Sequence, residues 1–259
     1  MSYGIDIGDA EEMNDVISLG TRRELFVDHH VADSMDGTSL KLHNPIPAGV
    51  AINYDEPWEK GEKGSSAFFT TVFQDGDTYR MYYRGNSNVC YAESDDGIGW
   101  VKPKLGLVKA NGSDQNNIIL GVCQNSFSPF LDTKPGVASA QRYKSTMECD
   151  SSSKDTSRMG LNCYSSSDGK EFMHFGGDRA IPWTIANHFD SQNVAFWSEV
   201  ESQYVMYARY MVSIDGALID TDEYSRLLHD DLEALIARDR AKGTYIRSTA
   251  KATSADFLN

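Results

Sequence analysis

The feature that most constrains this chain is a hairpin pattern over residues 78–100. Tyr79–Arg84 is rich in aromatic residues, which favour strands, and Val89–Ser94 reads as the returning strand after a polar turn. Asp96-Gly97 then forms a second tight turn before Trp100, since glycine accepts positive φ and aspartate bonds its own backbone. A single hairpin is marginal in water, so the pattern requires neighbouring strands.

The same order of features recurs over residues 142–172 and again over 203–257. Each copy has a strand led by tyrosine, a returning strand, an Asp-containing turn and a closing aromatic residue, although the third return strand is delayed to about residue 244. Tyr79, Tyr143 and Tyr204 are separated by 64 and 61 residues. A steady period with several strands per unit is typical of a β-propeller, whereas three unrelated hairpins of a sandwich would not keep this order.

The sequence predicts an all-β domain over residues 22–259 that follows a loose acidic arm at 1–21. An N-terminal strand is expected at 22–28, and three blade units are expected at about 65–105, 116–176 and 188–259. Because the smallest propellers need four or more blades, we expect the propeller to be incomplete in this chain or to close by oligomerisation through bare sheet edges.

Residues 222–242 break the strand pattern. Leu227, Leu228, Leu232 and Leu235 recur at helical spacing, and Gly243 follows as a stop signal. These features predict an amphipathic helix inserted between two strands of the third unit and docked by its leucine face. A helix that binds a partner is the alternative.

Composition and charge exclude several functions. The formal net charge of −14 disfavours binding to nucleic acid phosphates and to anionic membranes. The sequence has no apolar run of the roughly 20 residues that span a bilayer, and the acidic N-terminus lacks a secretion leader, which slightly favours the cytoplasm. We expect no cofactor and no metal, since the adjacent His29 and His30 point to opposite faces of a strand. The widely spaced cysteines predict reduced thiols and no zinc site: Cys90, Cys123, Cys149 and Cys163.

A family resemblance follows from several segments taken in order: Arg23–Asp28, Pro57-Trp58-Glu59, Tyr79–Gly85, Tyr91–Trp100, Lys102–Val108, Asn116–Ile119 and Asp256-Phe257-Leu258. This succession, over residues 22–259, resembles bacterial proteins grouped with the five-bladed β-propeller glycoside hydrolases of families 32 and 43, among them β-fructosidases, arabinosidases and xylosidases. The resemblance implies carboxylates on the innermost strands of successive blades, because glycoside cleavage needs one group to protonate the leaving oxygen and another on the opposite face.

The resemblance places three catalytic candidates in this sequence. Asp55 stands before the first blade's inner strand, Asp132 ends the strand FSPFLD of the second blade, and Asp190 heads the third blade. Glu56 and Glu59 are substitutes for the first position. Each aspartate also has a structural reading as a turn cap or backbone acceptor, and both readings stay open.

Further residues are candidates for contacts with a sugar. Tryptophan faces suit the apolar side of sugar rings, and arginines at matching strand ends could pair with the inner acids. The expected substrate-binding set is Trp58, Glu59, Arg84, Trp183, Gln192 and Arg209.

The sequence thus predicts a glycoside hydrolase that acts on an oligosaccharide or polysaccharide. A carbohydrate-binding or scaffold propeller without turnover is the first alternative. A glycoside phosphorylase is the second, and it would draw its phosphate site from Arg179, His188 and Arg209.

Overall fold

The structure is a computed structural model of the 259-residue chain. It describes residues 18–21, 24–26, 29, 31–32, 34–61, 64–65, 68–121, 126–148, 160–176, 181–182, 189, 192–213 and 245–258. The chain divides into two units, an N-terminal unit Met1–Gly49 and a main unit Val50–Asn259. The described residues of the N-terminal unit form no helix or strand.

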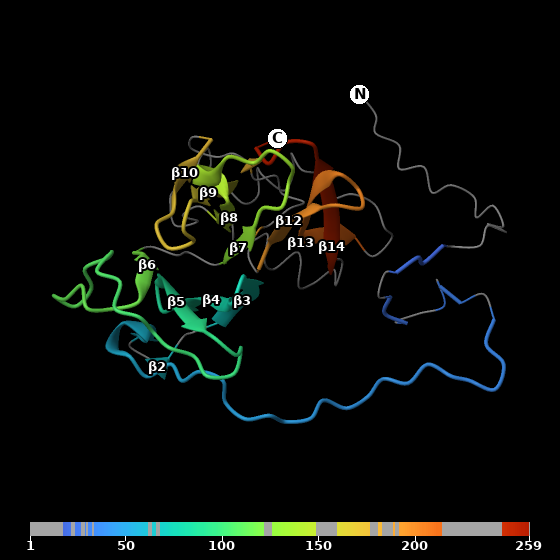
Figure 1. The fold of residues 1–259 in the computed structure, drawn as a ribbon, viewed down its shortest axis with the longest axis horizontal. Helices are drawn as coiled ribbons and strands as arrows, with labels where there is room; N and C mark the ends of the chain where they lie inside the picture. The colour runs from blue at the N-terminus through green and yellow to red at the C-terminus, as the bar shows by residue number, and fades with distance from the viewer. Residues whose placement is uncertain are drawn as a thin grey trace. The chain divides into compact units, whose positions relative to one another are not determined.

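The main unit consists of antiparallel sheets, which confirms the all-β prediction (Figure 1). The first sheet contains β3 (Phe68–Asp75), β4 (Thr78–Gly85), β5 (Asn88–Ser94) and β6 (Ile118–Leu120). The second contains β7 (Phe127–Leu131), β8 (Tyr143–Glu148), β9 (Gly160–Ser166) and β10 (Met173–Phe175), with β11 (Ile181–Pro182) also paired to β9. The third contains β12 (Val194–Ser198), β13 (Gln203–Ser213) and β14 (Tyr245–Ser254).

Four short elements complete the described secondary structure. The strands β1 (Lys60–Gly61) and β2 (Gly64–Ser65) pair with each other, and the 3₁₀ turns are η1 (Pro57–Glu59) and η2 (Ser139–Gln141). Glu56 and Glu59 form a capping box around η1, and Pro57 begins it, which is a favoured place for proline because the first helical N–H needs no partner.

The sheets repeat one another in register. The first and second strands of each sheet pair so that Tyr79 lies opposite Gln74, Tyr143 opposite Leu131 and Tyr204 opposite Trp197. Counting from these tyrosines defines equivalent positions in the three sheets. Tyr82 in β4, Thr146 in β8 and Tyr207 in β13 are one such set.

A Ser-x-Asp turn follows the third strand of each sheet. Asp96 accepts hydrogen bonds from the backbone N–H of Ile98 and Gly99, and Asp168 accepts them from Lys170 and Glu171. In the third sheet, the Leu258 N–H donates to Asp256. The Asp-containing turns expected from the sequence are therefore present, and the reason is that one short carboxylate satisfies successive backbone donors.

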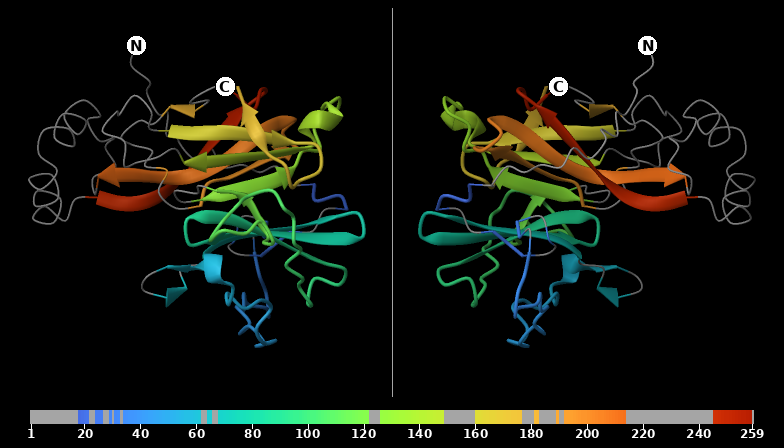
Figure 2. Two further views of the ribbon diagram at one scale, coloured as in Figure 1. Left: turned by 90° about the vertical axis from the view of Figure 1, so that its left-hand side faces the viewer. Right: turned by 90° about the vertical axis from the view of Figure 1, so that its right-hand side faces the viewer.

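The sheets are stacked face to face (Figure 2). Aromatic side chains fill the junction between the first and second sheets, namely Tyr82, Tyr91, Phe127, Tyr143, Tyr164 and Phe172. A second cluster lies between the second and third sheets and includes Phe130, Cys163, Tyr204 and Phe257. The first strand of the second sheet, β7, contacts both β3 and β12. Cys90 and Cys163 are buried and form no disulfide.

Several expected elements differ from the structure or fall outside it. Residues 118–120 were expected to open the second unit, but they pair with β5 as the fourth strand of the first sheet. Residues 24–26, the described part of the expected N-terminal strand, are not in a strand. The expected helix at 222–242 lies outside the described residues.

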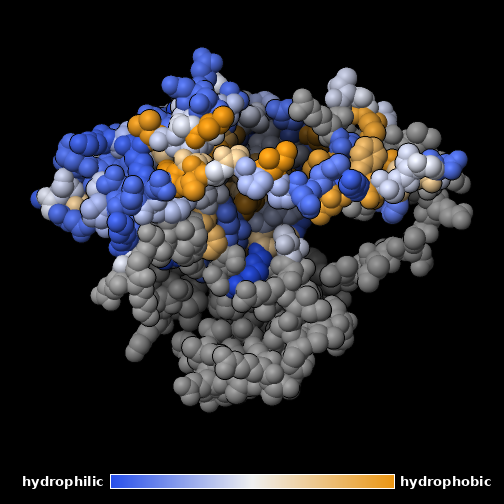
Figure 3. All heavy atoms as spheres, turned by 90° about the horizontal axis from the view of Figure 1, so that it is seen from below, coloured by the Kyte–Doolittle hydropathy of each residue, from blue (hydrophilic) through white to orange (hydrophobic). Residues whose placement is uncertain are grey.

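Two further findings concern the surface and the helices of the described residues. Figure 3 shows apolar residues in small groups between polar ones on one face. In the described part of the chain, no helix has the length and apolar character that crossing a membrane requires.

Candidate functional site

Asp132 lies at the carboxyl end of β7, where the second and third sheets meet. It is 4% exposed, and its Oδ2 accepts hydrogen bonds from Lys144 Nζ and, at 2.8 Å, from Tyr204 Oη. Its Oδ1 accepts the Lys134 N–H at 3.0 Å. Burial raises the pKa of Tyr204, and the hydrogen bond to Asp132 raises it further because it favours the protonated phenol.

Asp75 occupies the equivalent place at the end of β3, between the first and second sheets. It accepts hydrogen bonds from Arg142 and from Tyr143 Oη, and Arg80 Nε lies 3.0 Å from its Oδ2. Although burial opposes ionisation, Tyr143, Arg142 and Arg80 together hold the pKa of Asp75 below its usual value. Burial and the bond to Asp75 raise the pKa of Tyr143 to about 12.

Asp75 and Asp132 therefore make the same contact at successive junctions, which we call the aspartate clamp. In both clamps a carboxylate that ends a first strand binds a cation of its own sheet, Arg80 or Lys144. It also accepts a hydrogen bond from a tyrosine of the next sheet, which is Tyr143 for Asp75 and Tyr204 for Asp132. The clamp joins neighbouring sheets, and this contact explains the position of both aspartates without a catalytic role.

Asp55 lies in a different environment. Its side chain is 71% exposed, and Oδ1 is 3.1 Å from Lys102 Nζ. The hydrogen bond and the charge of Lys102 lower the pKa of Asp55. Lys102 also donates to Glu59 Oε2 at 2.8 Å, and although its partial burial opposes charging, Glu59 and Asp55 raise its pKa.

Glu59 is completely buried beneath this lysine. Its Oε1 accepts Tyr83 Oη at 2.5 Å, and Tyr83 Oη accepts Asn117 Nδ2 at 2.8 Å. Asn117 Oδ1 in turn accepts the Trp58 indole N–H at 2.8 Å. Burial and the contacts with Cys90 and Glu59 raise the pKa of Tyr83. The predicted sugar contacts Trp58 and Glu59 thus belong to a hydrogen-bonded network that packs η1 against the first sheet.

Polar groups from all three sheets meet at the opposite ends of the first strands. Gln192, just before β12, donates from Nε2 to Thr71 Oγ1 of β3 at 2.8 Å. Asn193 Nδ2 lies 3.4 Å from Ser126 Oγ, just before β7, and donates to the Phe189 carbonyl at 2.8 Å. Ser126 and Asn193 are each 1% exposed.

The backbone of β3 is distorted at this end. The pairing of β3 with β4 shifts register between Phe68 and Thr71, and Phe69 has a φ of 56°. A bulge redirects side chains, and a non-glycine residue in the left-handed region costs of order 1–3 kcal/mol. Such strained positions concentrate at functional sites, so the bulge makes this end of β3 a candidate for a functional site.

By register, each second strand also has a charged residue near this end of the first strand. Arg84 pairs with Phe68, Glu148 directly follows the pair of Met147 with Phe127, and Arg209 lies two residues beyond the pair of Tyr207 with Val194. These three residues are equivalent in the repeat, and Glu148 is buried. We call the whole group the polar end: Thr71, Arg84, Ser126, Glu148, Gln192, Asn193 and Arg209.

The described residues of the predicted site lie in three different places. Arg84, Gln192 and Arg209 share the polar end, whereas Asp132 lies at the other end of β7, and Asp55, Trp58 and Glu59 belong to the Lys102 network. Asp190, Trp183, Arg179 and His188 lie outside the described residues.

Sequence reasoning did not select Glu148. The signal was nevertheless available, because Arg84, Glu148 and Arg209 each stand five residues after Tyr79, Tyr143 and Tyr204. Within the described ranges, no three His, Cys, Asp or Glu side chains are grouped as metal ligands would be.

The polar end offers amide, hydroxyl, guanidinium and carboxylate groups. Amides and hydroxyls both donate and accept hydrogen bonds, guanidinium only donates, and an ionised carboxylate only accepts. Such a mixture suits a ligand with many hydroxyl groups, and a carboxyl group can also transfer protons.

No protein-family model matches the sequence, and no curated protein matches it. Solved structures are similar at low identity. A thermostable family-43 glycoside hydrolase is 12% identical with a TM-score of 0.40, over 74% of this chain and 50% of the other. A glycosyl hydrolase from Bacteroides ovatus is 12% identical with a TM-score of 0.38, over 64% of this chain and 46% of the other.

An exo-inulinase from Aspergillus awamori is 14% identical with a TM-score of 0.38, over 62% of this chain and 38% of the other. The chain spans about half the length, or less, of these three structures. At these TM-scores the likeness carries no argument about activity, which must rest on the residues of this chain.

Proposed function

We propose that the chain binds a carbohydrate at the polar end and hydrolyses a glycosidic bond there. The observation that carries the proposal is the hydrogen bond from Gln192 to Thr71, because it joins the start of the third sheet to the bulge of the first. Segments more than 100 residues apart in sequence thereby present hydrogen-bonding groups together, as a site for a polyhydroxylated ligand requires.

Within this proposal, Glu148 and Asp190 supply the two carboxyl groups that the reaction needs. Glu148 is buried at the polar end, and Asp190 precedes Gln192 by two residues. Burial disfavours the charged form of a carboxyl group, and an ionised neighbour does so as well, so one member of such a pair can stay protonated as the acid.

Arg84, Gln192 and Arg209 are proposed to bind the sugar, and Trp183 is proposed to stack on it. Asp132 and Asp55, predicted as catalytic from the resemblance, have structural roles in this proposal, since Asp132 is held by Lys144 and Tyr204 and Asp55 by Lys102.

The first experiment is a hydrolysis screen of the purified full chain against aryl glycosides and oligosaccharides. We expect turnover of at least one substrate, and we expect Glu148→Gln and Asp190→Asn each to lower kcat/KM by at least about 100-fold, which is the smallest usual contribution of general acid–base catalysis. Asp114→Asn removes an exposed carboxylate outside the polar end and serves as the matched control.

Binding measurements separate the proposal from its alternatives. If sugars bind without turnover and Gln192→Ala weakens that binding, the chain is a carbohydrate-binding protein without catalysis. Turnover that depends on added phosphate would indicate a phosphorylase, for which Arg209 is a described cation at the polar end. Absence of both binding and turnover in a folded protein rejects a carbohydrate function.

A further inference from the structure

The two sheet junctions are built on one plan but are filled differently. At the first junction, Tyr82 is completely buried and its ring packs 5.3 Å from Tyr91 and 6.2 Å from Phe172, measured between ring centroids. Its hydroxyl donates to the Gly169 carbonyl of the second sheet at 2.8 Å. The first junction is therefore closed by a phenol ring with its hydroxyl satisfied.

Smaller side chains stand at the equivalent positions of the second junction. In the first sheet Tyr82 pairs with Tyr91, and at the equivalent positions of the second sheet Thr146 pairs with Cys163. The pairs with the first strands, Tyr82 with Thr71 and Thr146 with Ser128, give the same correspondence. Thr146 therefore takes the place of Tyr82, and Cys163 takes that of Tyr91. In the same way Ala252, which pairs with Met206, takes the place of Tyr164, which pairs with Ser145. Three tyrosines are thus replaced by threonine, cysteine and alanine.

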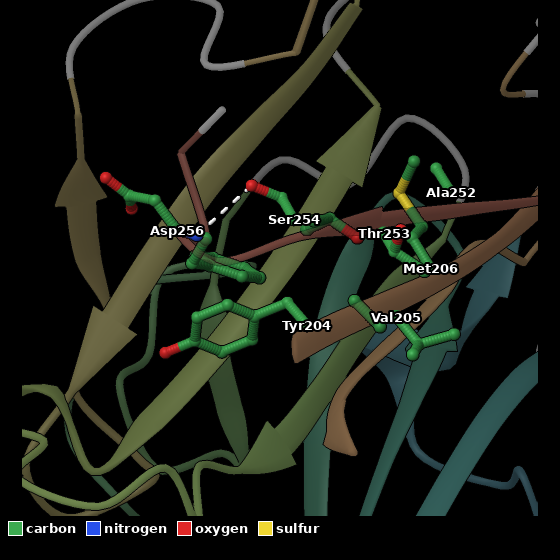
Figure 4. A pocket seen from close by; sticks show the side chains of 10 residues that line it. Tyr204, Val205, Met206, Ala252, Thr253, Ser254 and Asp256 are labelled. Carbon is green, nitrogen blue, oxygen red and sulfur yellow. Dashed lines mark hydrogen bonds between the residues drawn. The ribbon is translucent and has the colours of Figure 1, made fainter. Parts of the chain in front are cut away.

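Other side chains replace only part of the lost volume. Met206 takes the place that Ser145 has in the first junction. Phe257 takes the place of Gly169, because each lies three residues after the serine that ends its strand, Ser254 or Ser166. A partly open pocket of about 130 Å³, at which Ala252 is exposed, remains between the second and third sheets (Figure 4). We call this pocket the cavity. Its lining is mainly apolar and includes Thr146, Ala195, Tyr204, Met206, Ala252 and Phe257.

One polar group of this cavity has no hydrogen-bond partner. Thr146 is 1% exposed, and its Oγ1 has no partner among the described residues. Two other polar groups of the lining are occupied, since Tyr204 Oη donates to Asp132 and Ser254 Oγ accepts the Asp256 N–H at 3.1 Å (Figure 4). Ser128, which pairs with Thr146 across the strands, also has a buried hydroxyl without a partner among the described residues. A buried hydroxyl without a partner costs about 1–3 kcal/mol, so a bound group that pairs with it would be favoured.

From these observations we infer that the cavity is a binding site for a small aromatic molecule with one hydroxyl group, of the phenol class. Its ring would fill the space that Tyr82 fills at the first junction, and its hydroxyl would pair with Thr146. The size agrees, since an apolar cavity of about 150 Å³ in another protein binds benzene. The inference does not depend on the proposed carbohydrate function.

The test measures binding of phenol and of benzene to the full chain by calorimetry and by the shift in melting temperature. We expect both probes to bind and phenol to bind more tightly. Thr146→Val keeps the shape of the side chain and removes its hydroxyl, so it should weaken phenol binding about fivefold, as expected for one hydrogen bond, and leave benzene binding unchanged.

Thr146→Tyr places the ring of the first junction into the second. It should abolish binding of both probes and raise the melting temperature without ligand, because the cavity is then filled from within. If circular dichroism shows that this variant does not fold, Ala252→Leu fills the cavity from the opposite sheet and should abolish binding in the same way. Thr249→Val, at an exposed position of β14, is the matched control and should bind as the unaltered chain does.

Two outcomes overturn the inference. If neither probe binds the folded protein, the cavity holds only water or is closed in solution. If phenol binding survives in a folded, cavity-filled variant, phenol binds elsewhere. Both outcomes leave the carbohydrate proposal intact, since its readout is hydrolysis at the polar end.

Discussion

Asp132 matches the sequence pattern of a catalytic carboxylate, but its contacts join two neighbouring sheets. Asp132 follows the first strand of the second sheet, where the family resemblance predicts a catalytic carboxylate, but both of its oxygens are already bonded, to Lys144 Nζ, Tyr204 Oη and the backbone N–H of Lys134. The same arrangement recurs at Asp75. Because the two clamps repeat, sheet stacking accounts for both aspartates.

We predict that Asp132→Asn destabilises the fold by about 3–5 kcal/mol, because it leaves the charge of Lys144 buried without a counter-ion. Lys144 is 3% exposed, so water cannot replace the lost partner. Urea unfolding of the variant and of Asp114→Asn, which should lie within about 0.5 kcal/mol of the unaltered chain, provides the comparison. Equal stability of the two variants would contradict the clamp.

Asp75 leads to a prediction about pH. Its pKa is lowered in the folded state, so its contribution to stability is present above the unfolded pKa of about 3.9 and is lost as pH falls through the folded pKa. The difference in unfolding free energy between the unaltered chain and Asp75→Asn should therefore be largest above about pH 5 and shrink toward pH 3. Urea unfolding at several pH values measures it, and a difference independent of pH would rule out this linkage.

At the scale of elements, the Ser-x-Asp turns of the second and third sheets each contact the sheet before them. The turn after β9 presents the carbonyls of Asp168 and Gly169 to Arg80 and Tyr82 of the first sheet, each at 2.8 Å. The turn after β14 presents the Ala255 carbonyl to Lys134 at 2.9 Å. Local turn chemistry thus also sets the spacing of the sheets.

Gly169 provides a prediction for this element. Its φ is +75°, and a Cβ there would lie 2.8 Å from Tyr82 Oη and 3.1 Å from Tyr143 Cε1. Gly169→Ala should therefore cost backbone strain plus repacking, together about 2–4 kcal/mol. Gly136→Ala has a φ of +80° but open space around the Cβ, so it should cost only the strain of about 1 kcal/mol. Thermal unfolding compares the two, and equal losses would refute the packing role.

At the scale of the whole molecule, the buried core belongs to the main unit. Every buried apolar side chain among the described residues lies between Met81 and Phe257. A unit with its own core can fold by itself. The N-terminal unit contributes exposed apolar side chains instead, such as Leu42 and Ile46.

We therefore predict that a chain shortened to residues 50–259 folds and melts within a few degrees of the full chain, since a loss of 1 kcal/mol shifts the melting temperature by only about 2–4 °C at this size. A chain shortened to residues 78–259 lacks β3, which pairs along β4, and should not fold. Circular dichroism melting distinguishes these outcomes. Loss of folding in the 50–259 chain would show that the core depends on the N-terminal unit.

The strands and their turns were predictable because they depend on local chemistry. Aromatic residues in Tyr79–Arg84 and the Asp-Gly turns act over a few residues, and their recurrence every 60 or so positions predicted repeated meanders. The fourth strand of the first sheet was not predictable in this way, since Ile118–Leu120 joins β5 across a gap of more than 20 residues.

By itself, the sequence determined the all-β class, the repeated hairpins and the Asp-containing turns, because propensity and turn chemistry are local properties. Only the tertiary structure decided which charged residues meet. It paired Asp132 with Lys144 and Tyr204, buried Glu59 under Lys102, and brought Gln192 to Thr71. Such contacts depend on how sheets stack and on which strand ends coincide, and residue type alone does not encode that geometry.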